Sequence, residues 1–424
     1  MKHSRHTALL ATLLVPFGLL HAFVLAEICI ADTDILFLIE SWRTRNFAWA
    51  RQTWFIIALV WWGWLVLCTI PWPGVTTAGL VMGVVQALVI IRLLVFAAAL
   101  QSWVLTTPTA RRALWLALAL SVLWIGLESW QQYFTGHNIF GNPRWSDGSL
   151  TGPFWKPRAG AVYGHLVMVA ALLPVMALLS RPGRVWQIAG MGLMALAVVT
   201  SILIGQRMGA AFSLFSLALA GLLLKPLRRA TAIAFAAAAL VLLATPIISP
   251  ATHGKLVNET ATNMGHFSQS PYGELYTRAT NMGLASPWHG WGYNGFREFC
   301  PQSRFDGGLP ALNIPTTQIA LGACNLHPHN FYLQALTDAG IPGLILFITL
   351  NFAWLWALWR GIWRGRDTLR IALFIGALTF IWPVASTDEF PTLYTSGWFF
   401  LMLGLSLAVP YMLPNTTELE TEHA

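Results

Sequence analysis

The chain has 424 residues, of which 56% are hydrophobic and only 10% are charged, and its formal net charge is +8. A soluble domain carries charge on roughly a quarter of its residues, so this composition excludes an ordinary soluble protein. Basic residues are not collected into an arm that would bind nucleic acid. We therefore expect an all-α, polytopic integral membrane protein with no nucleic-acid partner.

Hydrophobic runs long enough to cross a bilayer recur along the chain. The first part, residues 7–41, has room for one span or two short ones, and it follows a basic start that resembles an uncleaved start-transfer helix. Ten further spans are expected at 52–70, 76–100, 112–130, 160–180, 186–204, 208–224, 230–249, 338–359, 369–386 and 394–412.

Basic residues occupy every second loop, which predicts that those loops face the cytoplasm. The basic residues are Arg43, Arg45, Arg51, Arg111, Arg112, Arg181, Arg184, Lys225, Arg228, Arg229, Arg360, Arg364, Arg366 and Arg370. The opposite loops, expected to face outward, are 71–75, 131–159, 205–207, 250–337 and 387–393. Lys2 and Arg5 lie inside only if residues 7–41 cross twice, and this favours about twelve spans.

The expected organisation has four parts. Residues 1–249 form N-terminal transmembrane helices, 250–337 a large outward loop, 338–412 C-terminal transmembrane helices, and 413–424 a cytoplasmic tail. Residues 250–337 are too many for a simple connection, so we expect them to fold as a lid or small helical cap.

Two histidines mark the junction between this loop and the next apolar helix, in the sequence His327-Pro328-His329-Asn330. A helix start offers free backbone N–H groups and a partial positive charge that favour an anion. A neutral imidazole there is a candidate general base near neutral pH. The alternative is a pair of ordinary interfacial histidines.

Arg207 interrupts a long apolar run in Gly205-Gln206-Arg207. The run from 186 to 224 is long enough for two crossings, so the interruption predicts a tight turn at the outer surface, with Gly205 and Gly209 permitting close backbone approach. An arginine at a helix start in the membrane is a natural phosphate ligand. The alternative is an arginine that snorkels to the lipid head groups.

Other charged residues are weaker candidates. Lys156 and Arg158 carry positive charge on the outward side, where the topology rule does not require it, so they are candidates for an anionic ligand or for local pairing. Arg92 lies inside a predicted span, where a buried structural pair explains it equally well. Arg278 lies in the long loop, where most arginines are solvated.

The cysteines and one acidic motif are candidates for disulfide and metal chemistry. Cys300 and Cys324 share the outward loop and can form a disulfide if that compartment is oxidising; Cys29 and Cys68 are expected to pack inertly in the membrane. The tripeptide Asp32-Thr33-Asp34 is either a helix-end cap or a weak metal ligand set. Because zinc, phosphate-loop and dinucleotide patterns are missing from the sequence, we expect no metal and no cofactor.

One pattern resembles a known family. His329-Asn330 is followed by nine residues, Gly340, two residues and Gly343, which fits His-[Asn/Ser/Gln]-x9-Gly-x-x-Gly. With many spans, one dominant loop and a Gly-Gln-Arg turn, residues 150–385 resemble the bacterial O-antigen ligase and O-antigen polymerase superfamily, which includes O-linked protein oligosaccharyltransferases. The resemblance also includes Pro287, Gly290, Gly292 and Phe296. Departures are Gly205-Gln206-Arg207 in place of Ser-Arg-Gly, and Lys156-Pro157-Arg158 in place of a Pro-Asn step.

The resemblance implies a metal-independent, inverting glycosyltransferase in the bacterial inner membrane, with its active site facing the periplasm. It would transfer a glycan from undecaprenyl diphosphate to an acceptor hydroxyl. By position, His329 would act as base or position the acceptor, and Arg207 and Arg278 would hold the diphosphate. His327, Asn330 and Gln206 would contribute to substrate binding.

The acceptor stays open between three readings. A ligase uses lipid A–core, a polymerase uses a second lipid-linked glycan, and an oligosaccharyltransferase uses a protein. The single dominant outward loop favours the ligase. A transporter or flippase is the alternative from another class, but its helix interruptions would be expected at mid-membrane rather than at one surface. The sequence does not indicate which sugar is transferred, which glycosidic linkage is formed or which oligomeric state the protein has.

Overall fold

The computed structural model describes residues 2–71, 80–316, 324, 327–360, 362, 367–384 and 389–409. Within these ranges the protein is built from helices, and the only β-type pairings are two isolated bridges. The expected all-α class is confirmed for this part of the chain. The predicted tail, 413–424, lies outside the described residues.

Helices occupy the predicted spans closely. They are α3 (Thr53–Thr69), α4 (Leu80–Val89), α5 (Ile91–Ala99), α6 (Pro108–Thr135), α7 (Ala159–Leu179), α8 (Arg184–Ile204), α9 (Arg207–Leu223), α10 (Arg228–Ile248), α15 (Phe331–Trp359), α17 (Thr368–Phe380) and α18 (Leu393–Ala408). A π-helical turn, η2 (Leu100–Val104), extends α5, and the 3-10 turns η1 (Ala48–Arg51) and η3 (Lys225–Leu227) precede α3 and α10.

Residues 7–41 fall on two helices rather than one. Helices α1 (Lys2–His21) and α2 (Phe23–Thr44) pack against each other and meet at Ala22. A side chain on Gly18 would lie 2.7 Å from the backbone nitrogen of Ala26, so glycine is needed for this close contact. The hairpin is the arrangement that the charge pattern favoured.

The structure also corrects the interpretation of Asp32 and Asp34. Both residues lie in the middle of α2, and neither is at a turn or a helix end. Positions two apart on a helix point to nearly opposite sides, and only Asp34 of the two is buried. They therefore do not form the helix cap or the paired metal ligands that the sequence allowed.

Six helices of the described chain are long and apolar enough to span a membrane, and α3, α9, α17 and α18 are shorter apolar helices. Together with α1 and α2 they cover all the predicted crossings, but the count of about twelve stays a prediction. Helix α7 packs against α6, α8, α9 and α17 and thus connects the two sides of the bundle. Gly164 of α7 meets Gly209 of α9, where an added Cβ would lie 2.6 Å from the Gly209 carbonyl oxygen.

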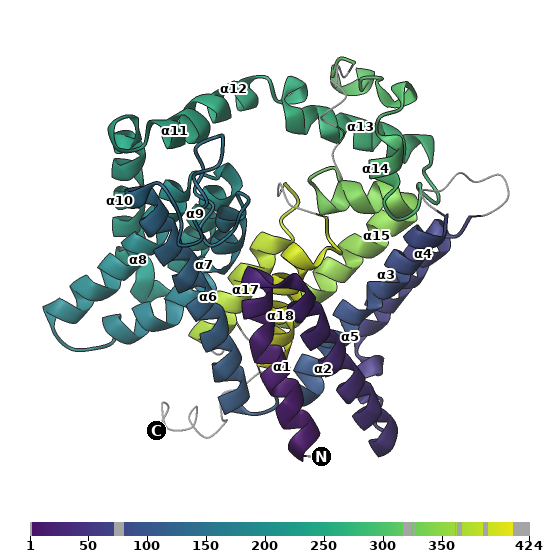
Figure 1. Ribbon diagram of the computed structural model, residues 1–424, viewed down its shortest axis with the longest axis horizontal. Coiled ribbons are helices and arrows are strands. Elements are labelled where there is room, and N and C mark those ends of the chain that lie inside the picture. The colour runs from purple at the N-terminus through teal and green to yellow at the C-terminus, as the bar shows by residue number, and fades with distance from the viewer. Residues whose placement is uncertain are drawn as a thin grey trace, which may run out of the picture.

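A helical cap covers one end of the bundle (Figure 1). Its elements are α11 (Pro250–His253), η4 (Gly254–Asn258), α12 (Glu259–Gly265), η5 (Phe267–Gln269), α13 (Pro271–Ala285), α14 (Gly295–Phe299), η6 (Ser303–Phe305) and η7 (Pro310–Leu312). It bridges from the α6–α10 side to the α3, α4 and α15 side (Figure 1). The described residues 250–316 of the predicted loop 250–337 are therefore a largely helical layer, and residues 331–337 belong to α15.

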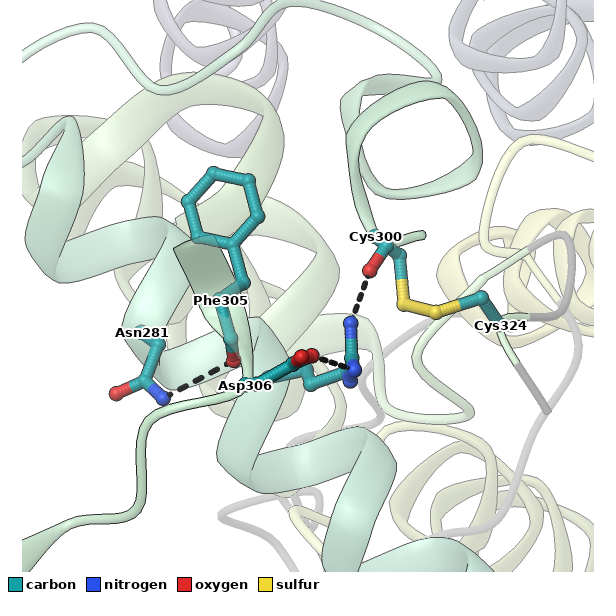
Figure 2. The surroundings of a disulfide bond; sticks show 6 residues. Asn281, Cys300, Phe305, Asp306 and Cys324 are labelled. Carbon is teal, nitrogen blue, oxygen red and sulfur yellow. Dashed lines mark hydrogen bonds and ion pairs between the residues drawn. A yellow bond between two sulfur atoms is a disulfide. The ribbon is translucent and has the colours of Figure 1, made fainter. Parts of the chain in front are cut away.

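The second half of the cap has a hydrophobic core of its own, formed by Leu275, Ala279, Met282, Trp291, Phe296, Phe299, Cys300 and Phe305. Cys300 and Cys324 form a disulfide beside this core, with Phe305, Asp306 and Asn281 close by (Figure 2). Trp291 is fixed further because its indole nitrogen donates to the Met282 carbonyl at 2.8 Å.

Helix α15 is broken at Gly340, whose φ of 68° and ψ of −168° are suited to glycine alone. The break removes helical partners from nearby carbonyls. Trp291 and Gly292 donate to the Thr337 and Asp338 carbonyls at 2.8 and 2.9 Å, and Ile341 donates to Pro287 at 2.7 Å. This set of backbone hydrogen bonds, the staple, joins residues 287–292 of the cap to the transmembrane helix.

Candidate active site

A cavity of about 590 Å³ lies between the cap and the bundle. Six predicted residues line it: Lys156, Arg158, Gln206, Arg207, His327 and His329. They come from the loop after α6, the turn between α8 and α9, and the segment before α15. Three distant parts of the sequence therefore meet in one pocket of the size typical for small-molecule sites.

The turn that holds Arg207 is as tight as predicted. Helix α8 ends at Ile204, Gly205 adopts a left-handed conformation with φ 79°, and α9 begins at Arg207. The Gln206 side chain does not cap α9; its Oε1 instead accepts from the Ala161 backbone N–H at 3.1 Å. The first-turn N–H groups of α9 are thus left for another acceptor, which favours an anion beside Arg207.

The histidine pair is held by the start of α15. The Asn330 side chain accepts from the Tyr332 and Leu333 N–H groups and donates to the Pro383 carbonyl at 2.6 Å. Asn330 therefore positions the helix. His329 has a φ of 52°, a costly conformation for a residue other than glycine, and its ring centroid is 4.3 Å from that of His327.

Tyr272 of α13 links the histidine and arginine sides of the cavity. Its ring lies edge-on to His329 at 5.5 Å, and the Arg207 guanidinium is 6.0 Å from its centroid. The imidazole and the guanidinium thus lie near one aromatic ring, and all three groups line a common pocket. This is the arrangement required if a base and a phosphate ligand act on one molecule.

Lys156 and Arg158 sit on aromatic faces at the start of α7. The Lys156 ammonium is 4.4 Å from the Trp155 ring centroid, and the Arg158 guanidinium is 3.8 Å from that of Tyr394. Cation–π contacts fix the position of a cation without neutralising it. Both charges are therefore available to an anion in the cavity.

The cap contributes one basic and one acidic side chain, Lys255 and Glu259, to the same cavity. Lys255 pairs with Asp147 and donates to the Ser149 hydroxyl at 2.7 Å, and Glu259 lies 3.7 Å from the Arg207 guanidinium. Burial alone would raise the pKa of Asp147, but hydrogen bonds from Lys255 and Ser149 lower it overall. The cavity thus holds four basic side chains against two carboxylates.

Arg278, Arg92 and Asn330 do not line the cavity. Arg278 is buried, and its guanidinium donates to the Cys300 carbonyl and the Asp306 carboxylate next to the disulfide. Arg92 makes two hydrogen bonds to Glu27, at 2.9 and 2.7 Å. The structure thus gives these arginines structural partners in place of the ligand-binding positions expected for them.

Several lining residues were not identified from the sequence. They are Trp145, Asp147, His165, Lys255, Glu259, Tyr272 and Tyr394. His165 lies on α7 with its ring stacked between Phe212 and Phe380 at 4.5 and 4.0 Å. The polar loops that carry Asp147, Lys255 and Glu259 were recognisable, but a loop sequence alone does not indicate which side chains point inward.

The fold and site define a class: a helical membrane protein with a basic, histidine-containing cavity under a cap at one end of its bundle. Residues 192–348 match the family model described as O-antigen ligase. That stretch contains Arg207, Arg278, His329 and both glycines of the histidine–glycine pattern. The match confirms, over residues 192–348, the resemblance to the O-antigen ligase superfamily. A comparison with curated proteins found no match.

Proposed function

We propose that this protein transfers a glycan from undecaprenyl diphosphate to an acceptor hydroxyl, at the periplasmic face of the bacterial inner membrane. The observation that carries the proposal is the meeting of Arg207, Lys156, Arg158 and the two histidines in one cavity. Outside the cytoplasm no nucleotide supplies energy, so a lipid diphosphate is the natural activated donor. Its leaving charge matches the basic cavity.

The reaction follows from the positions of these groups. His329 accepts the proton of the acceptor hydroxyl, and the hydroxyl oxygen bonds to the anomeric carbon. The bond between that carbon and the diphosphate oxygen breaks, and its electron pair leaves on the diphosphate. Arg207, the N–H groups at the start of α9, Lys156 and Arg158 stabilise the developing charge. A single displacement inverts the anomeric configuration.

Within this proposal, the residues that bind the diphosphate differ from those that the family resemblance implies. Arg278 holds the second half of the cap together through Cys300 and Asp306. Lys156 and Arg158 take its place with Arg207, because they line the same cavity as the residues at the start of α9. A protein cation in that position serves the purpose that a metal serves in other glycosyltransferases, so we propose a metal-independent reaction.

A transporter is less consistent with the same features. The interruption in α15 at Gly340 resembles the broken helices of transporters, but its carbonyls bond to the staple segment of the cap. The break therefore anchors the cap to the bundle.

The test is transfer by His329→Ala in membranes that contain a lipid-linked glycan. We expect transfer to be lost while expression and gel-filtration behaviour stay normal, because His329 is half-buried and its ring faces the cavity. His266→Ala is the matched control, since His266 is an exposed histidine of the cap outside the cavity. Near-normal transfer by His329→Ala would remove this residue from the mechanism.

The acceptor is proposed to be lipid A–core. A strain without the protein should make core-only lipopolysaccharide and accumulate lipid-linked polymer. A core carrying one repeat would indicate a polymerase instead, and an unchanged ladder would favour a protein acceptor. These outcomes concern the acceptor only and leave the donor site unaffected.

A further inference from the structure

A second cavity, of about 410 Å³, lies at the end of the bundle away from the cap. It is formed where α2 ends, η1 follows, and the π-helical turn η2 widens the continuation of α5. In Figure 1 the purple α1–α2 pair extends away from the cap, and this cavity is at the α2 C-terminal end. Wide π-turns within helices are frequent at functional sites.

Glu40 is the charged group of this cavity. The residue is only 8% exposed, and its carboxylate has no ion pair or side-chain hydrogen bond within the described residues. A buried carboxylate is costly unless a cation pairs with it, and the cost is larger near a bilayer. The geometry therefore calls for a positively charged partner supplied by a ligand.

Aromatic rings form one wall beside Glu40. The Phe37 ring centroid is 5.0 Å from that of Trp49 and 6.0 Å from that of Trp103, and all three residues line the cavity. The Trp49 indole nitrogen donates to the Ser41 hydroxyl at 3.1 Å, which fixes the ring. Aromatic faces next to a carboxylate are the chemistry that recognises an organic ammonium group.

The other wall offers hydrogen-bond donors. The Oε1 atoms of Gln52 and Gln101 both accept from the Trp54 indole nitrogen, at 2.7 and 3.0 Å. Their amide NH₂ groups are therefore directed to other acceptors, and both residues line the cavity. Arg45 and Arg51 are exposed in the same turn. Donors and arginines are the groups that bind a phosphate.

We propose that this cavity binds an ethanolamine phosphate group, with the ammonium at Glu40 and the aromatic rings and the phosphate at the glutamine amides. The shared chemistry has two sources, a phosphatidylethanolamine head group and a soluble ethanolamine derivative. Arg45 and Arg51, exposed in the chain segment that lines the cavity, favour the lipid. This site is separate from the cavity under the cap and does not depend on the proposed transfer reaction.

The experiment measures the thermal unfolding midpoint of the full-length protein in nanodiscs. Phosphatidylglycerol alone is compared with a mixture containing phosphatidylethanolamine, and bound lipid is counted by native mass spectrometry. We expect the mixture to raise the midpoint, because a ligand that binds only the native state stabilises it. Phosphatidylethanolamine should be retained at least about tenfold better than phosphatidylglycerol, which corresponds to about 1.4 kcal/mol.

Glu40→Gln should abolish this preference, because it removes the charge and keeps the shape. In phosphatidylglycerol alone the variant should unfold at or above the wild-type temperature, since it no longer buries a carboxylate. Asp32→Asn is the matched control, because it removes the same charge from the same helix outside the cavity. Trp103→Ala should weaken the preference less than Glu40→Gln.

One outcome identifies the source of the ligand, and two others would overturn the proposal. Stabilisation by added phosphoethanolamine in phosphatidylglycerol nanodiscs, without any effect of phosphatidylethanolamine, would support the site and identify a soluble ligand. An equal lipid preference in wild type and Glu40→Gln, or no preference in the wild type for either probe, would overturn the proposal.

Discussion

The two halves of the cap differ in how they are held and in what they contribute. Residues 250–269 bury almost nothing of their own, and α12 has no buried residue, yet Lys255 and Glu259 reach the cavity from this half. Residues 270–316 have a hydrophobic core, a disulfide and the staple to α15. The two halves therefore have different roles. The second half anchors the cap to the bundle, and the first half contributes charged side chains to the cavity and is held over it by ion pairs.

The same division explains why two similar arginines have different environments. Arg207 lines the cavity and lies near a carboxylate of the weakly packed half at 3.7 Å. Arg278 is buried in the anchored half, where Asp306 and the Cys300 carbonyl use its donors. Replacing each arginine should thus affect different properties of the protein.

The largest effect is expected from Arg207→Ala. Loss of a donor that stabilises a leaving charge lowers rates by roughly 10²–10³-fold, so glycan transfer should fall by about that factor. The unfolding midpoint should stay close to wild type, because the side chain faces the cavity and its ion pair with Glu259 is partly exposed. Transfer measured with purified lipid-linked donor tests this, and unimpaired transfer would contradict the assignment.

The next effect is on the anchored half. Cys300→Ser with Cys324→Ser should destabilise the cap by about 3 kcal/mol, because the disulfide closes a loop with a sequence separation of 24. Hydrogen exchange in residues 270–305 should rise accordingly. Single-turnover transfer by the fraction that stays folded should be retained. An unchanged exchange rate would show that the staple alone is sufficient.

Arg278→Ala should destabilise the same half by about 2–3 kcal/mol, since it removes the donor to the Cys300 carbonyl and the ion pair with the Asp306 carboxylate. This expected loss of stability is smaller than is usual for breaking a buried ion pair, because the Asp306 side chain is 41% exposed to solvent. Thermal unfolding measures it. A variant with normal stability and abolished transfer would restore Arg278 to the donor site and overturn the division between the two halves.

The smallest effect concerns pH. The lowered pKa of Asp147 means that its pair with Lys255 is fully formed above the ordinary aspartate pKa of about 3.9 and weakens only as the pH falls through the lower folded value. The protection factors for hydrogen exchange in residues 254–258, which are corrected for the pH dependence of intrinsic exchange, should therefore be flat between about pH 5 and 8. Asp147→Asn should lower these protection factors at every pH in that range. A wild-type transition near pH 6 would contradict this pairing.

Much of the architecture was predictable because bilayer thickness and helical geometry limit what an apolar run can form. The glycine turn at Gly205 and the helix start at Arg207 followed from the length of one run that had to cross twice. The cavity was predictable only in part. Lys156 and Arg158 could be predicted because they are basic residues in a loop expected to face outward, where the topology rule does not require positive charge. Both residues line the pocket.

The remaining contacts depend on tertiary packing, which leaves no local pattern. Arg278 differs from Arg207 through Asp306, a residue 28 positions away, and nothing in the chain between them indicates that pair. Tyr272 looks like any tyrosine near a helix start, yet the fold places it close to both Arg207 and His329. In the sequence, the only sign of the break in α15 is Gly340 of the histidine–glycine pattern, because the backbone angle φ is set by the folded structure.

The break at Gly340 has a geometric consequence for His329. The helical segment between them is fixed at both ends, by the Asn330 bond to Pro383 and by the staple. Its length acts as a ruler: one residue more or fewer would turn the imidazole by about 100° around the helix axis. The nine residues between Asn330 and Gly340 thus determine the direction in which the His329 side chain points. Inserting or deleting one of them would turn the imidazole away from the cavity and inactivate the site, although no residue that lines the cavity would be changed.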